Sequence, residues 1–164
     1  MASLLLAVIY LAFIGLGLPD SLLGSGWPVM HEELGAPLSA MGLISMIIAA
    51  GTVVSSLASD FLTRKLGTGL VTFISVLMTA GAMLAFSFAR TYWLLCVLAV
   101  PYGLGAGGVD AALNNYVALY YKSRHMSWLH CFWGVGALIS PFIMSYALAG
   151  GGGWGAGYSL VSYI

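Results

Sequence analysis

Five long apolar stretches, separated by short groups of charged residues, constrain this chain more than any other feature. Only 6% of its residues are charged and 61% are hydrophobic, whereas about a quarter of the residues in a soluble domain are charged. A helix that crosses a bilayer needs ~20 apolar residues, so the 164 residues have room for several spans. We therefore expect an all-α integral membrane protein. The five basic and five acidic residues cancel, which leaves no basic surface for nucleic acid.

The charged residues divide the hydropathy into a series of predicted helices within one transmembrane domain, residues 1–164. We set each boundary where an apolar run meets charged or polar residues. The last segment is too short to cross a bilayer, so we expect five complete transmembrane helices and the start of a sixth. The expected helices span residues 3–28, 38–59, 70–89, 93–121, 129–149 and 154–164.

The distribution of basic residues predicts the orientation. With the N-terminus in the cytoplasm of a plasma or inner membrane, the inner connections hold Arg64, Lys65, Lys122 and Arg124, and the outer ones hold only Arg90. This satisfies the positive-inside rule.

A short motif, G-x-G-x-x-D, occurs twice at an offset of 90 residues. The copies lie in the first and the fourth predicted helices, an offset of three helices, so the two motifs would cross the membrane in opposite senses. Such inverted repeats of three helices build many secondary transporters; chance in a glycine-rich chain is the alternative. The matched positions are Gly15 with Gly105, Gly17 with Gly107, and Asp20 with Asp110.

Two carboxylates, Asp20 and Asp110, fall inside the predicted spans. An ionised Asp at a helix centre costs ~2.5–3.5 kcal/mol on insertion scales, so it is paired, protonated or turned toward a water-filled cavity. Asn114 shares the helix face of Asp110, and the predicted spans contain no lysine or arginine. We expect these three residues to couple protons or to bind substrate. The alternative is that the carboxylates only hold neighbouring helices together.

Aromatic and imidazole groups on the same faces are candidate cavity-lining residues. Trp27 shares a face with Asp20, while His130 and Trp133 share a face of the fifth helix. Carboxylates and amides bind hydroxyl groups, and aromatic rings cover the apolar side of a sugar. His130 alone is also consistent with a residue of the membrane interface.

Enzyme templates do not fit, and we expect neither an enzyme, a metal site nor a cofactor. The segment 31–35, HEELG, has glycine where the zinc motif H-E-x-x-H requires its second histidine. Cys96 and Cys131 both lie in apolar stretches, where a thiol behaves as a small hydrophobic group.

On these residues the whole chain resembles the N-terminal half of a major facilitator superfamily transporter, and it is most similar to the fucose-permease-like branch of sugar and proton symporters. The similarity is carried by the segment 17–23 around Asp20, by Asp110 with Asn114, and by residues 126–141. It implies proton-coupled uptake of a sugar-like solute by alternating access, together with a C-terminal half that these 164 residues lack.

The resemblance also implies a cytoplasmic gating loop after the second helix, where the superfamily pattern is G-x-x-x-D-R-x-G-R-K. Asp60, Arg64 and Lys65 match this pattern, while Ser56, Phe61 and Thr63 depart from it. The alternative for the whole chain is a small multi-span membrane protein that acts as an accessory or assembly partner. For residues 1–164 alone we expect no saturable solute flux unless they assemble with another half.

Overall fold

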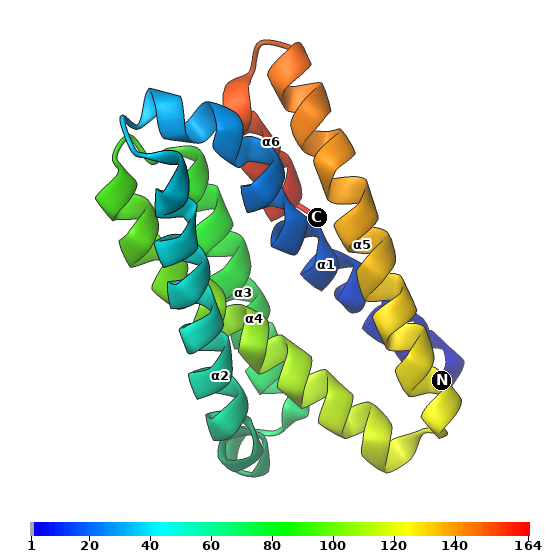
Figure 1. Ribbon diagram of the computed structural model, residues 1–164. Helices are drawn as coiled ribbons and strands as arrows, with labels where there is room; N and C mark the ends of the chain where they lie inside the picture. Colours follow the sequence, from blue (N-terminus) through cyan, green and yellow to red (C-terminus); the bar gives the residue numbers. More distant parts are fainter. Residues whose placement is uncertain (1) are drawn as a thin grey trace.

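The computed structural model describes residues 2–164, and the described residues form six α-helices with one short 3-10 helix, η1, and no β-strand (Figure 1). Five of the helices, α1 to α5, are long and apolar enough to cross a membrane. The expected all-α membrane bundle is therefore confirmed. The helices are α1 (Ala2–Glu33), η1 (Leu38–Ala40), α2 (Met41–Leu66), α3 (Thr68–Ser87), α4 (Tyr92–Tyr120), α5 (Ser123–Ala149) and α6 (Gly153–Ser162).

The long helices pack in two pairs. Helix α1 lies along α5, and α2 lies along α4, while α3 packs against α4 and the short α6 packs against α3 and α5 (Figure 1). If α1, α2 and α3 are exchanged with α4, α5 and α6 in that order, the α1–α5 pair becomes the α4–α2 pair. The packing thus has the symmetry that an inverted repeat of three helices produces.

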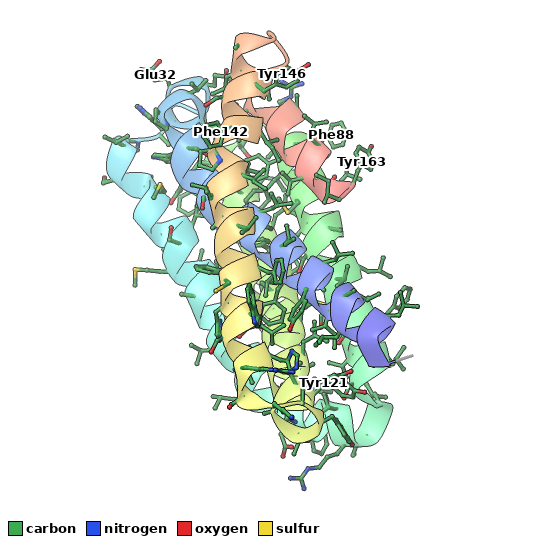
Figure 2. All side chains as sticks on the ribbon, turned by 90° about the vertical axis from the view of Figure 1, so that its right-hand side faces the viewer. Glu32, Phe88, Tyr121, Phe142, Tyr146 and Tyr163 are labelled. Carbon is green, nitrogen blue, oxygen red and sulfur yellow. The ribbon has the colours of Figure 1, made fainter. Side chains whose placement is uncertain are left out.

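Large apolar side chains cover the outside of the bundle. Phe142 and Tyr146 lie on α5, and Phe88 and Tyr163 lie just after α3 and α6 (Figure 2). The exposed fractions of the four side chains are 70%, 76%, 68% and 79%. Soluble monomers rarely expose apolar surface on this scale. The exterior therefore suits contact with lipid.

Three helices extend beyond the boundaries expected from hydropathy. Helix α1 continues to Glu33, α2 continues to Leu66 instead of ending at residue 59, and α5 begins at Ser123 instead of residue 129. Charged residues mark where a helix leaves the hydrocarbon, but they do not stop a helix. In α2 the ion pair between Asp60 and Arg64, four residues apart, is of the kind that supports a helix.

A single residue, Gly67, connects α2 to α3. It has φ 82° and ψ 148°, a backbone conformation that glycine adopts readily and residues with a side chain rarely do. We expect Gly67→Ala to destabilise the protein by about 1–3 kcal/mol, seen as a lower melting temperature in detergent. Gly69→Ala is the matched control, because Gly69 lies within α3 and an added methyl group there contacts nothing within 4 Å. Equal melting temperatures for the two variants would contradict this prediction.

Candidate functional site

The fold brings Asp20 and Asp110 to one cavity of ≈ 260 Å³. Both repeat copies therefore place their carboxylate in the same space, although 90 residues separate them in the sequence. Four helices, α1, α2, α4 and α5, supply the walls. We call this space the carboxylate cavity; it is lined by Leu16, Asp20, Ile48, Thr52, Ala106, Asp110 and Trp133.

The carboxylate of Asp20 joins three helices. Its Oδ2 accepts a hydrogen bond of 2.9 Å from the indole Nε1 of Trp133 on α5. Its Oδ1 accepts one of 3.4 Å from the hydroxyl of Tyr102 on α4. Asp20 itself stays exposed within the bundle, so its carboxylate is both held in place and open to a bound molecule.

The carboxylate of Asp110 is bonded by a side chain of its own helix. Its Oδ1 accepts a hydrogen bond of 2.9 Å from Nδ2 of Asn114. The Oδ1 of Asn114 is buried and has no partner within residues 2–164. The second carboxylate therefore lies beside an amide oxygen that is still free to accept a hydrogen bond.

Glycines allow the helices to come close enough to form this site. A side chain at Gly17 would overlap the carbonyl oxygen of Trp133 on α5, and one at Gly107 would overlap that of Thr52 on α2. These two glycines are matched positions of the repeat. Gly103 meets α2 in the same manner at Ile48, as small residues spaced four apart commonly do in membrane helices. The repeated motif thus sets helix spacing with its second glycine and supplies the cavity with its aspartate.

Trp27 lies elsewhere. It is 2% exposed, and its indole Nε1 donates a hydrogen bond of 2.8 Å to the carbonyl of Leu38 at the connection between α1 and α2. It is not among the residues that line the carboxylate cavity, so its packing does not fit the cavity-lining role predicted for it. Trp27 lies two turns beyond Asp20 on α1, where the bundle closes over the face that the two residues share.

Of the two residues predicted on α5, only Trp133 lines the carboxylate cavity. Its side chain is 38% exposed. His130 lies one turn away, is exposed, and meets the ring of Phe13 edge to face at 6.3 Å between centroids. His130 is not among the residues that line the carboxylate cavity.

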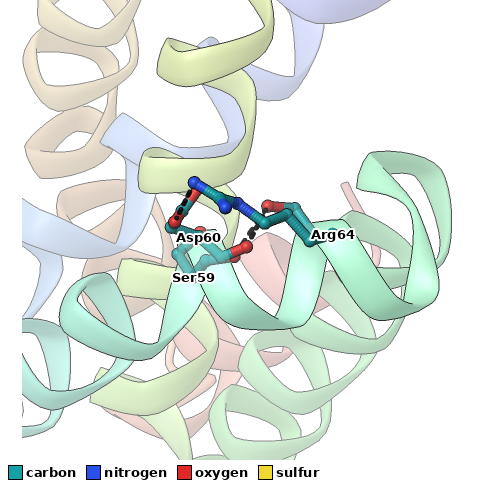
Figure 3. Close-up of polar contacts among 4 residues, drawn as sticks. Ser59, Asp60 and Arg64 are labelled. Carbon is teal, nitrogen blue, oxygen red and sulfur yellow. Dashed lines mark hydrogen bonds and ion pairs between the residues drawn. The ribbon is translucent and has the colours of Figure 1, made fainter.

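The three residues of the expected gating loop lie on the last turns of α2 rather than in a loop. Arg64 Nη2 is 2.9 Å from Asp60 Oδ2, and both side chains are exposed (Figure 3). Lys65 lies over the ring of Phe61 at 4.4 Å from its centroid. These contacts are local to α2, and exposed ion pairs of this kind contribute about 0–1 kcal/mol.

Two site residues escaped the sequence reasoning. Tyr102 lies four residues before Ala106 and eight before Asp110, so extending that helix face by one turn would have found it. Thr52 comes from α2, whose predicted span contains no charged residue to draw attention to it. No group of three or more His, Cys, Asp or Glu residues in the described part of the chain could hold a metal ion.

A multi-pass helical bundle with carboxylates in a cavity between its helices is the architecture of a membrane transporter domain. The chain belongs to the Major Facilitator Superfamily, whose family description matches residues 9–164. The expectation of that superfamily is therefore confirmed.

The chain is similar to several curated proteins at low identity. It is 25% identical to human synaptic vesicle glycoprotein 2B over 93% of this chain and 23% of that protein. It is 24% identical to mouse sodium-dependent glucose transporter 1A over 84% of this chain and 33% of that protein. The human sodium-dependent glucose transporter 1 is 25% identical, over 84% and 27%. The chain thus spans a third or less of the length of these relatives, and they do not single out the fucose-permease-like branch.

Proposed function

We propose that the complete protein is a secondary active transporter that carries an uncharged polyhydroxylated solute, such as a sugar, together with protons. The observation that supports this most is the carboxylate cavity itself, in which Asp20 and Asp110 meet between the two helix pairs. Hydrogen-bonding groups in a cavity that is otherwise apolar are typical of small-molecule sites.

The charges of the cavity support ion coupling. All five lysines and arginines lie at helix ends or in connections, and none lines this space. The two carboxylates line the same cavity. Two carboxylates without a basic group nearby repel each other, and a bound proton would neutralise one of them. We assign the coupled proton to this pair.

The polar groups around Asp20 and Asp110 suit hydroxyl groups. Carboxylate oxygens accept hydrogen bonds from a sugar, and the half-exposed indole of Trp133 offers a flat apolar face. The names of the sodium-dependent glucose transporters also favour a sugar, and they make sodium the competing coupling ion.

The helix pairs suggest how such a site would open. In alternating access one half of a transporter rocks against the other around a site near the midplane. The α1–α5 and α2–α4 pairs line the carboxylate cavity, and we propose that a second helical half covers it from the other side. The basic residues at Arg64, Lys65, Lys122 and Arg124 favour a cytoplasmic N-terminus in a plasma or inner membrane.

The test is uptake into proteoliposomes that contain the complete protein. We expect labelled hexoses to accumulate when the outside is acidic, up to about tenfold per pH unit for one proton per solute. A sodium gradient at equal pH is the comparison. Accumulation driven only by sodium would overturn the proton assignment, and no saturable uptake of any hexose or polyol would overturn the proposed substrate class.

A further inference from the structure

A second cavity adjoins the carboxylate cavity and has a different lining. It encloses ≈ 280 Å³ and reaches past α1, α2 and α4 to α3 and α6. Most of its wall is apolar or aromatic. We call it the aromatic recess, after Phe86 on α3, Tyr102 on α4 and Tyr158 on α6. The helices α3 and α6, which supply its far wall, contain no charged residue.

The two cavities meet at Asp20. Asp20 and Ile48 line both of them, so a molecule bound to the Asp20 carboxylate can extend in either direction. Tyr102 marks the same junction, since its ring lines the recess while its hydroxyl donates to Asp20. One carboxylate therefore separates a polar lobe from an apolar lobe.

The unpaired hydroxyl of Tyr158 is the second observation that indicates a ligand at the recess. The residue is 3% exposed, and its ring packs on Phe86 at 5.4 Å between centroids. Its hydroxyl is buried and has no hydrogen-bond partner within residues 2–164. Buried polar groups of folded proteins are nearly always paired, and an unpaired one needs an explanation. A polar atom of a bound molecule would supply the partner.

The sizes of the cavities indicate that one ligand uses both. Small-molecule sites usually enclose roughly 300–1,000 Å³. Neither the aromatic recess, at ≈ 280 Å³, nor the carboxylate cavity, at ≈ 260 Å³, reaches that range alone. The two together fall well within it. A free monosaccharide would leave the aromatic lobe without an occupant.

We propose that the aromatic recess binds the apolar aglycone of a glycoside. The sugar ring occupies the carboxylate cavity, and the aglycone lies among Phe86, Tyr102 and Tyr158, where its far polar atom pairs with the Tyr158 hydroxyl. This assignment rests on the proposed sugar-like substrate and narrows it from free sugars to glycosides with an aromatic-sized substituent.

Equilibrium binding to the complete protein in lipid nanodiscs, measured by titration calorimetry, tests the proposal. The probes are the methyl, phenyl and 4-nitrophenyl glycosides of glucose and galactose. Burial of the aromatic ring should make the phenyl glycoside bind about tenfold tighter or more than the methyl glycoside. The nitro group, as a hydrogen-bond acceptor for Tyr158, should tighten binding by roughly threefold to tenfold more.

Two variants separate the lobes without disturbing the packing. Gly24 lines the recess, and an added Cβ there contacts nothing within 4 Å, so the longer side chain of Gly24→Leu should extend into the recess and remove the advantage of phenyl over methyl. Gly15→Leu is the matched control on the same helix, because Gly15 is equally unobstructed and does not line the recess. Tyr158→Phe should remove only the advantage of nitrophenyl over phenyl.

The results distinguish the two proposals. If methyl glycosides bind but phenyl glycosides bind no tighter, or if Gly24→Leu weakens all probes alike, the recess is not an aglycone site, although the proposed transport of sugars stands. If no glycoside binds to the unaltered protein, the sugar-like substrate is wrong and the aglycone assignment fails with it.

Discussion

Replacing Asp20 or Asp110 by asparagine in the complete protein should abolish proton-driven solute accumulation. Asparagine keeps the size and the hydrogen-bonding oxygen of aspartate but cannot carry a proton. Both carboxylates line one cavity and we assign the coupled proton to the pair, so we expect neither carboxylate alone to sustain coupling. We expect the ratio of internal to external solute to fall from about tenfold per pH unit to equality. The measurement is uptake into proteoliposomes under an inward proton gradient.

Counterflow and a control variant separate coupling from binding. Exchange of labelled for unlabelled solute at equal pH needs binding and helix movement but no gradient, so Asp110→Asn should retain it. Glu32→Gln is the matched control, because Glu32 is an exposed carboxylate at the end of α1 that lies outside the cavity. Undiminished accumulation by both the Asp20→Asn and Asp110→Asn variants would refute the proton assignment and leave the carboxylates a structural role.

The fold was largely predictable because long apolar segments in the sequence identify membrane-spanning helices. A span must satisfy its backbone hydrogen bonds internally, so long apolar runs have few alternatives to helix. The ends were less predictable. Charged residues near the ends of α1, α2 and α5 mark the edge of the hydrocarbon, whereas α2 stops only where Gly67 takes a positive φ. The residue at which a helix leaves the hydrocarbon and the residue at which the helix ends are therefore set by different physical causes.

The site was predictable where the sequence repeats. The match between Asp20 and Asp110 at equal offsets indicated two equivalent positions, and both line the carboxylate cavity. Trp27 shows the limit of the same reasoning. A shared helix face predicts the side of the helix on which a residue lies, but not how far along the helix a cavity extends. Trp27 is covered by the connection to α2, where its indole donates a hydrogen bond to Leu38.

Residues contributed by uncharged helices had no comparable signal. Thr52 on α2 and Tyr158 on α6 reach the cavities through tertiary packing alone. Neither lies in a repeated motif, and a hydroxyl group in an apolar helix is common enough to pass unnoticed. Their positions depend on which helices pair, and hydropathy does not encode that pairing.

The second large effect concerns the close contacts of the repeat glycines. A valine at Gly17 would overlap the backbone carbonyl of Trp133 on α5, and a valine at Gly107 would overlap that of Thr52 on α2. Backbone atoms cannot rotate away as side-chain ends can, so each helix pair would have to separate. Overpacking of this kind typically costs 1–3 kcal/mol or more. We expect either variant to lower the melting temperature in detergent by roughly 5 °C or more.

Gly24→Val provides the comparison, because Gly24 lies two turns from Gly17 on α1 and an added Cβ there contacts nothing within 4 Å. Its melting temperature should stay within about 2 °C of the unaltered protein, since substitutions that touch no other group seldom exceed ~0.5 kcal/mol. The two repeat variants should also resemble each other, because they separate symmetry-related helix pairs. If Gly17→Val is harmless while Gly107→Val is severe, the contacts between α1 and α5 and between α2 and α4 are not equivalent. The repeated motif would then not be the element that sets both helix spacings.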